Sequence, residues 1–298
     1  MGCFQSTPNV TGMCINVPRP PNSPATLIMR HIRKNTRQLD ISSSKRSMLF
    51  VDKYDIIWKI STSELVEIAE LIQRNNTLVM SLPENNYILK PTSVTRLTPH
   101  VLCICQPMAF CDLHEWGCVP FKWETVTIFL KQVAEGIHWL HDLNVCHGDI
   151  KPENIVLQGL HARIIDFDFV ASLEDTSQCH TKMFKPPREI VSEWNVANSI
   201  LSKRCDVYAF GKTILFMLFR LELHRGKVPV SWWKKSYIAR GHAHSFEALE
   251  GKWADIAFEC CRRCPPERIP TILSSLELAD DSKRERDDRK NKTENRNT

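Results

Sequence analysis

Long apolar runs are absent from this chain of 298 residues. No stretch approaches the roughly 18 to 20 uninterrupted apolar residues that a membrane-spanning helix requires, and no apolar signal region follows the first methionine. The 39 lysines and arginines and the 34 acidic residues are spread along the chain, so no basic block predicts a nucleic-acid partner. We therefore expect a cytoplasmic protein that neither spans a membrane nor binds nucleic acid.

Metal-binding spacing is also missing, although the chain contains 12 cysteines. A disulfide framework is typical of short secreted chains, which this sequence does not resemble. One group of cysteines lacks the second pair of a zinc ribbon, and another alternates with apolar residues as in a strand. These groups are Cys260, Cys261 and Cys264, and Cys103, Cys105, Cys111 and Cys118. We expect reduced thiols and no cysteine metal site.

Four segments follow from length and composition. With 43% hydrophobic residues, a chain of this length is expected to divide into two lobes. The proline-containing, polar residues 1–38 predict a flexible segment. Residues 39–107 predict a small β-rich lobe, and residues 108–279 a larger helical lobe with apolar residues at three- and four-residue spacing. Residues 280–298 have almost nothing to bury and predict a disordered, charged tail.

The small lobe shows its elements clearly in the hydrophobic pattern. Apolar runs at 48–51, 56–60 and 100–106 predict strands, and the spacing at 63–73 predicts a helix between the second and third of them. The order is strand, strand, helix, strand. An α+β fold class is the expectation.

A polar cluster at the start of the second lobe suggests chemistry. "CHGDIKPENIV" occupies residues 146–156, and "IIDFDF" begins at Ile164. Phosphoryl transfer requires a carboxylate near the attacking hydroxyl, oxygen ligands for metal ions and cations on the developing charge. Asp149, Lys151, Asn154 and Asp166 supply these groups. A polar turn between two buried strands is the alternative interpretation.

These motifs, in this order, resemble the protein kinase family over residues 39–278. "HGDIKPENI" resembles its catalytic loop and "DFD" its metal-binding motif. The resemblance implies a bilobal kinase-like fold with ATP and Mg²⁺ as cofactors. It implies that Asp149 orients and deprotonates the acceptor hydroxyl, that Lys151 neutralises the transferring phosphate, and that Asn154 and Asp166 hold the metal.

The resemblance also implies a set of supporting residues. "FKPPRE" ends at Glu189 and resembles the family's Ala-Pro-Glu segment, whose glutamate pairs with an arginine, here Arg268. Asp206, in "CDVYAFG", is expected to brace the catalytic loop, and His147 belongs to that loop. These four residues are expected to act as scaffold.

The nucleotide pocket is implied less directly. Lys59 resembles the strand lysine that contacts the α- and β-phosphates, with Glu67 as its first candidate partner and Glu70 as the second. Either acid could instead lie on the solvated face of its helix. Ser42, Ser44 and Ser47 stand where the family has three glycines, which let the backbone approach phosphate closely. A polar loop unrelated to nucleotide is the alternative there.

The lobe connection is expected to contact adenine and ribose. "CDL" resembles the start of the next helix, and counting back from it places the hinge from Gln106 to Met108. Cys105 is then expected at the entrance to the back pocket, and Asp112 near the ribose. The alternative interpretation of "VLCICQ" is simply a buried strand and its edge.

Two substitutions bear on regulation and metal binding. Gly148 replaces the arginine that reads a phosphorylated activation segment in the family, so activity should not require that phosphate. Asp168 replaces the glycine after Phe167 and adds a carboxylate beside the metal motif.

The amino-terminal sequence "MGCFQS" predicts lipid attachment. Gly2 and Ser6 match the acceptor pattern for N-myristoylation. Because one myristoyl chain binds membranes only marginally, a second acyl group on Cys3 or attraction of nearby basic residues to an anionic membrane surface is needed. Those basic residues are Arg30, His31, Arg33, Lys34 and Arg37. An ordinary disordered start is the alternative.

The expected function is serine/threonine protein kinase activity, because Lys151 followed by Pro152 resembles that branch of the family. The expected partners are protein substrates with serine or threonine acceptors, and the expected state is a monomer. One alternative is a pseudokinase scaffold, favoured by the serine-substituted loop. Another is a small-molecule kinase on the same fold. The compressed small lobe resembles the reduced kinases of large DNA viruses.

Overall fold

The computed structural model describes residues 23–39, 47–172, 184, 186, 198–227, 248–262 and 265–266. Its first half is built on one antiparallel sheet of five strands in the order β1-β2-β3-β5-β4. The strands are β1 (Thr36–Gln38), β2 (Ser47–Asp52), β3 (Ile56–Thr62), β4 (Ser93–Thr98) and β5 (Val101–Pro107). Helices α1 (Pro24–Asn35) and α2 (Val66–Ser81) pack against this sheet.

The two faces of the sheet are covered by different helices. On β5, Cys103 and Cys105 pack in the cluster of α1, whereas Leu102 and Ile104 pack in the cluster of α2. This alternation follows from the two-residue period of a strand. Trp58 and Ile60 of β3 also lie in the α1 cluster, so Lys59 between them projects from the other face. The face of the sheet that carries Lys59 is therefore the one covered by α2.

Helix α1 was not expected, and the prediction of a flexible segment is wrong for residues 24–38. Ser23 caps the helix by accepting a hydrogen bond from the backbone N–H of Thr26, and Pro24 stands in the first helical turn, where proline is tolerated. Ala25 and Ile32 are buried against the sheet. Pro24, which was interpreted as part of a flexible linker, thus begins a helix that has one apolar face. Residues 1–22 lie outside the described part.

His31 fastens α1 to the turn between β2 and β3. Asp52 in that turn accepts hydrogen bonds from the backbone N–H groups of Tyr54 and Ile56 and from Nε1 of Trp58. Nε2 of His31 lies 3.4 Å from Oδ2 of Asp52, and its ring lies 4.7 Å from that of Trp58. Burial raises the pKa of Asp52, but these hydrogen bonds outweigh it and lower the pKa overall. His31 therefore contacts Asp52 and Trp58, with 32% of its side chain exposed.

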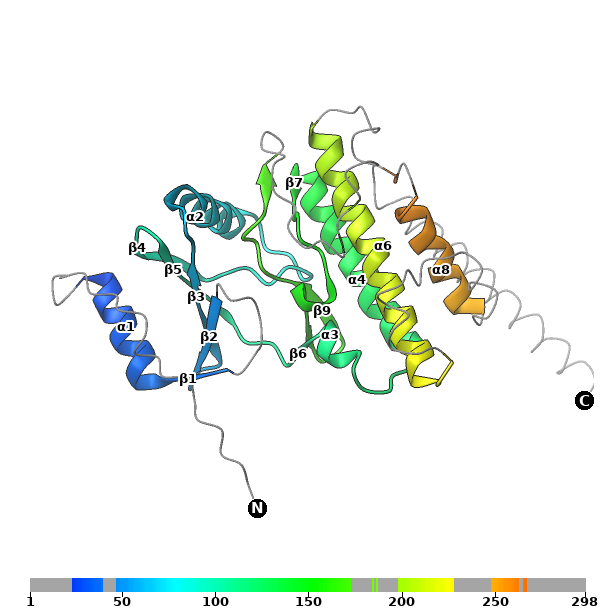
Figure 1. Cartoon of the computed structure of the whole chain (residues 1–298), viewed down its shortest axis with the longest axis horizontal. Coiled ribbons are helices and arrows are strands. Elements are labelled where there is room, and N and C mark those ends of the chain that lie inside the picture. Colours follow the sequence, from blue (N-terminus) through cyan, green and yellow to red (C-terminus); the bar gives the residue numbers. More distant parts are fainter. Residues whose placement is uncertain are drawn as a thin grey trace, which may run out of the picture.

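The second half of the described chain is mainly helical (Figure 1). Its helices are α3 (Leu113–Trp116), α4 (Trp123–Asp142), α6 (Asn198–His224) and α8 (Ala248–Cys260), with a 3-10 turn, η2, at Pro152–Asn154. Short strands β6 (Cys111–Asp112), β7 (Val145–Cys146), β8 (Ile155–Gln158), β9 (His161–Ile164) and β10 (Ala171–Ser172) lie at the boundary with the first half. Side chains of α4, α6 and α8 form one large core. The predicted α+β fold with a β-rich and a helical lobe is confirmed.

Among the described helices, none combines the length and the apolar character needed to cross a bilayer.

The crossing of α6 and α8 depends on a glycine. A Cβ atom on Gly211 would lie 2.5 Å from Cβ of Cys260 and 2.8 Å from Sγ of Cys261. We expect Gly211→Ala to lower the free energy of unfolding by about 1 to 3 kcal/mol, because the helices must separate. Gly251 on α8 is the matched control, since a Cβ there meets nothing within 4 Å. Gly251→Ala should be neutral or stabilise by up to about 1 kcal/mol, and urea unfolding measures both variants.

Candidate active site

The loop after β7 gathers a carboxylate, a lysine and an amide. Nζ of Lys151 lies 2.6 Å from Oδ2 of Asp149, and Nδ2 of Asn154 donates to the same oxygen at 3.0 Å and to the Asp149 carbonyl at 2.8 Å. Pro152 begins the 3-10 turn that brings Asn154 back over Asp149. The carboxylate of Asp149 is therefore fixed in one orientation although it lies in a turn.

Asp206 of α6 binds the backbone of this loop. Its carboxylate is 1% exposed and accepts hydrogen bonds from the backbone N–H groups of His147 at 2.8 Å and Gly148 at 2.9 Å, with Nε2 of His141 at 3.0 Å. Burial raises the pKa of Asp206, but the contact with His141 and these amides outweigh it and lower the pKa. A buried anion with three donors anchors the loop to the longest described helix.

His147 connects the loop to the segment after β9. Its Nδ1 accepts from the backbone N–H of Asp149 at 3.2 Å, so Nε2 carries the proton that is donated to the carbonyl of Ile165 at 2.9 Å. The backbone N–H of Ile165 in turn donates to the carbonyl of Asn154 at 3.0 Å. These bonds fix where Asp166 emerges relative to Asp149.

Asp166 occupies a strained backbone position at the end of this connection. Its backbone φ is +67°, in the left-handed region that residues other than glycine rarely adopt. Such backbone strain often occurs at functional sites. Oδ1 of Asp166 lies 2.8 Å from Nζ of Lys59 on β3. Burial raises the pKa of Asp166, but the charges of Lys59 and then Lys151 outweigh it and lower the pKa. The structure thus brings together Lys59, Asp149, Lys151, Asn154 and Asp166.

The donor set fits a divalent cation of the Mg²⁺ type. Asn154 uses its Nδ2 group to hold Asp149, which leaves its amide oxygen as the ligand atom, and Asp166 supplies a carboxylate. Amide and carboxylate oxygens are the ligands that Mg²⁺ prefers. Lys59 and Lys151 add two cations beside these oxygens, so the cluster also suits a polyphosphate.

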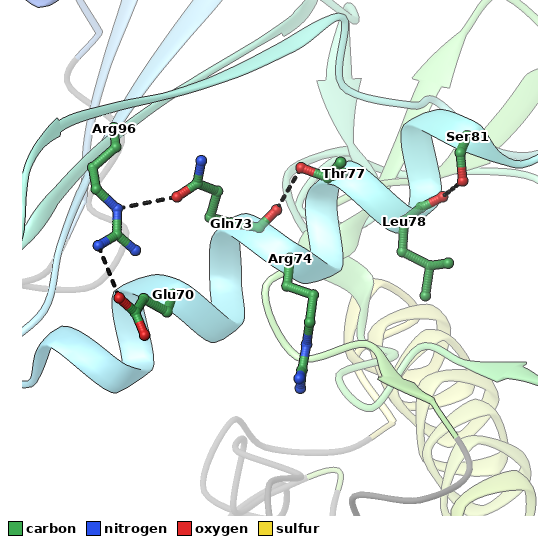
Figure 2. A pocket seen from close by; sticks show the side chains of 7 residues that line it. All are labelled: Glu70, Gln73, Arg74, Thr77, Leu78, Ser81 and Arg96. Carbon is green, nitrogen blue, oxygen red and sulfur yellow. Dashed lines mark hydrogen bonds and ion pairs between the residues drawn. The ribbon is translucent and has the colours of Figure 1, made fainter.

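The predicted glutamate partners of Lys59 are not where they were expected. Glu67 is exposed on α2, and Glu70 lies 3.3 Å from Nη1 of Arg96 on β4. Figure 2 shows this contact, with Glu70 and Arg96 bordering a surface hollow of about 620 Å³ along α2. No catalytic candidate lines that hollow. Glu67 and Glu70 were chosen from sequence spacing, but the helix turns both away from Lys59.

Asp168, which was expected to affect the metal motif, occupies that place instead, together with Asn75 and Asn76, which the sequence analysis missed. Oδ2 of Asp168 lies 2.7 Å from Nζ of Lys59, and Nδ2 of Asn76 donates to Oδ1 of Asp168 at 3.1 Å. Nδ2 of Asn75 donates to the carbonyl of Asp168 at 3.0 Å. A signal existed, since "NN" interrupts the apolar stripe of α2, and buried amides require partners.

The lobe connection differs from the prediction at two positions. Cys105 packs beneath α1, on the face opposite Lys59, so it does not guard the pocket. The backbone N–H of Met108 donates to the carbonyl of Asp55 at 2.7 Å, and its carbonyl accepts from Nε2 of Gln158 at 3.1 Å. The backbone N–H of Met108 thus continues the β3–β5 pairing past Pro107, and both backbone groups of this hinge residue are hydrogen-bonded to protein.

Gln106 and Asp112 lie nearer to their expected places. Gln106 pairs with Ile57 on β3, and by the period of two its side chain projects on the face of Lys59. Asp112 follows the connection and caps α3 by accepting from the backbone N–H of Glu115 at 2.7 Å. Burial raises the pKa of Asp112 to about 6. Asp112 thus has a structural role at the start of α3.

The remaining predicted residues are only partly described. Ser47 begins β2 and pairs with Ser61 on β3, so it belongs to the strand that follows the expected phosphate loop. Six predicted residues lie outside the described part of the chain: Gly2, Cys3, Ser42, Ser44, Glu189 and Arg268.

Gly148 has no room for a side chain. Its φ is +81°, and a Cβ atom there would lie 2.5 Å from the carbonyl oxygen of Phe169. An arginine at this position would require the two backbone segments to separate. The packing of the loop against Phe169 therefore leaves no space for an arginine at position 148.

The protein kinase domain family matches residues 41–276. Receptor-like kinase TMK2 of Arabidopsis thaliana is 29% identical over 189 residues, 54% of this chain and 21% of that protein. Inhibitor of nuclear factor kappa-B kinase subunit alpha of Xenopus tropicalis is 28% identical over 168 residues, 54% of this chain and 22% of that protein.

A viral protein is among the similar sequences. A serine/threonine-protein kinase homologue of Acanthamoeba polyphaga mimivirus is 32% identical over 105 residues, 35% of this chain and 38% of that protein. The matched parts thus span well under half the length of all three relatives.

Proposed function

This chain belongs to the protein kinase family, and from that premise we propose that it transfers the γ-phosphate of ATP to serine and threonine hydroxyls of proteins. One observation carries the proposal. Lys59 of the β-rich lobe contacts Asp166, while Asp149, Lys151 and Asn154 are locked together beside it. Positioning supplies most of the catalysis in phosphoryl transfer, so an arrangement already held by hydrogen bonds is the important feature.

Each residue has a role that matches its contacts. Asp149 would accept the hydrogen bond of the acceptor hydroxyl and take its proton, while Lys151, beside that carboxylate, would attract the transferred phosphate. Lys59 would bind the remaining phosphates from the opposite lobe. Asn154 and Asp166 would hold Mg²⁺, which when bound neutralises phosphate charge. Asp206 keeps the loop in register through His147 and Gly148.

Two alternatives make different predictions in one assay. A pseudokinase would transfer little or no phosphate whether or not it binds nucleotide, and the hydrogen bonds that already engage the backbone of Met108 favour that alternative. A small-molecule kinase would phosphorylate aminoglycosides or choline but no protein. Lys151 followed by Pro152 favours protein substrates with serine or threonine.

The test combines binding and transfer. Purified protein is incubated with radiolabelled ATP and a generic basic acceptor protein, with Mg²⁺ or with a chelator. We expect Mg²⁺-dependent label on phosphoserine and phosphothreonine, identified by phosphoamino-acid analysis. Label on phosphotyrosine alone would refute the proposed specificity. Label on a small molecule only, or ATP binding without transfer, would support one of the alternatives.

Membrane attachment is a second proposal, favoured by the exposed basic residues that follow the amino-terminal segment. Arg30, Arg33 and Lys34 on α1 and Arg37 on β1 are exposed, in contrast to His31. Their charge would supplement an acyl chain on Gly2, with or without a second on Cys3, at an anionic lipid surface. The protein would then be cytoplasmic and held at the inner face of a membrane.

Vesicle sedimentation tests this attachment. Protein expressed with a myristoyl transferase should bind vesicles containing phosphatidylserine, and Gly2→Ala should abolish the binding. Substituting Arg30, Arg33 and Lys34 by alanine should weaken binding to anionic vesicles about tenfold or more but leave binding to neutral vesicles unchanged. Equal sedimentation of Gly2→Ala and wild type would rule out acyl anchoring.

A further inference from the structure

The ammonium group of Lys59 lies between two carboxylates from the same short segment. Nζ is 2.8 Å from Oδ1 of Asp166 and 2.7 Å from Oδ2 of Asp168. The lysine side chain is 14% exposed and that of Asp168 is 8% exposed. Phe167, between the two acids, is buried against the core of the helical lobe. The lysine is thus held by an anchored segment that the helical lobe contributes.

Both oxygens of Asp168 already have donors. Oδ2 accepts from Lys59 and Oδ1 from Nδ2 of Asn76, while the main-chain carbonyl accepts from Nδ2 of Asn75. A carboxylate so engaged is poorly placed to act as an additional metal ligand. Its contacts instead are those of a counter-ion whose orientation is fixed by two neutral amides of α2.

Helix α2 therefore offers Lys59 no charge of its own. Its first-turn acid, Glu67, is exposed, and Glu70 contacts Arg96 on the far side. The residues of α2 that face the catalytic segment are Asn75 and Asn76, which are both buried. The negative charge that the family resemblance leads one to expect on this helix is found at position 168.

We propose that Asp168 is the positioning residue for Lys59, and that Asn75 and Asn76 hold Asp168 in place. The inference rests on the proposed function for its consequence in phosphoryl transfer, but the contact itself is independent of catalysis. One segment then orients both the metal-binding carboxylate of Asp166 and the phosphate-binding lysine. Helix α2 contributes orientation only, through neutral donors.

Moving the negative charge from position 168 to position 76 on helix α2 tests this assignment directly. We expect Asp168→Gly to weaken the affinity for a fluorescent ATP analogue and to raise KM for ATP, each about tenfold or more, because Lys59 loses one of its two anchors. Adding Asn76→Glu should restore both values to within about threefold, because residue 76 contacts the same site from α2. Glu67→Gln is the control on the same helix and should change neither value.

A second measurement does not require nucleotide. The two carboxylates hold the ammonium group of Lys59 in a site where its side chain is only 14% exposed, so an amine-reactive reagent should label it slowly. Asp168→Asn, which keeps the side-chain shape, should increase the labelling rate of Lys59 several-fold by mass spectrometry, with exposed Lys53 as the internal reference.

The outcomes separate this inference from the proposed function. A protein that transfers no phosphate but shows the affinity loss, the rescue and the labelling change would disprove the function and retain the role of Asp168. Unchanged affinity in folded Asp168→Gly, no rescue by Asn76→Glu, or unchanged labelling of Lys59 in Asp168→Asn would overturn the inference. Thermal unfolding of each variant establishes that it is folded.

Discussion

Asp149→Asn should lower kcat for phosphoryl transfer by about 10²–10⁴-fold, the range typical of a lost general base. Asparagine has nearly the same shape but cannot take the proton of the acceptor hydroxyl. Lys151 and Asn154, which contact the Asp149 carboxylate, would remain in place. Initial rates of peptide phosphorylation at saturating ATP measure the change. KM for ATP should stay within about threefold, because in the proposed function Asp149 acts on the acceptor hydroxyl and not on ATP.

The same variant separates intrinsic activity from contamination. Wild-type and Asp149→Asn proteins purified in parallel should have equal melting temperatures and equal affinity for an ATP analogue. Equal phosphorylation by the two preparations would mean that the activity belongs to another kinase. The pseudokinase alternative would then be favoured.

Asp206→Ala should have the largest effect on stability, lowering the free energy of unfolding by about 3 to 5 kcal/mol. The substitution removes the acceptor of three donors, namely the amides of His147 and Gly148 and the ring of His141. Unpaired buried donors lose their solvation without compensation. Urea unfolding at pH 7 measures the loss. Asp142→Ala is the control, because its side chain is 56% exposed and pairs only with His138 at the surface, and it should cost less than about 0.5 kcal/mol.

The contribution of Asp206 should depend on pH in a defined direction. Its folded pKa is lowered, so the carboxylate stabilises the fold fully above the pKa of an unfolded aspartate, about 3.9. That stabilisation is lost as the pH falls through the lower, folded pKa. The difference between wild type and Asp206→Ala should therefore be constant from pH 5 to 7 and shrink below about pH 4. A difference that grew on acidification would contradict the hydrogen-bonded, ionised carboxylate.

The architecture followed from local patterns. Strands β2, β3 and β5 lie where the apolar runs placed them, whereas α2 continues to Ser81, beyond the end predicted at Gln73, and β4 was not predicted. Local spacing also placed Asp149, Lys151 and Asn154, because five residues of chain with a turn-forming proline allow few arrangements. Within the described residues, composition was misleading at Pro24, which suggested a linker and instead begins α1.

The partners of Lys59 could not be found in the same way. Its contacts with Asp166 and Asp168 join residues 107 and 109 positions apart, so no nearby spacing contains them. Glu67 was selected because it is close in sequence, whereas the direction of α2 decides which residues meet the lysine. The prediction for Cys105 was wrong for a related reason, because a one-residue change of register on a strand moves a side chain to the opposite face of the sheet.

The position of α1 has a practical consequence for anyone producing this protein. The region matched by the kinase domain family starts at residue 41, but α1 and β1 complete the sheet before that boundary. A fragment beginning at residue 41 would expose the apolar side chains of Phe50, Ile60 and Cys103 that α1 covers. It would also lose the contact of His31 with Asp52. The smallest unit able to fold and stay in solution should accordingly start no later than Ser23, ahead of the region matched by the family.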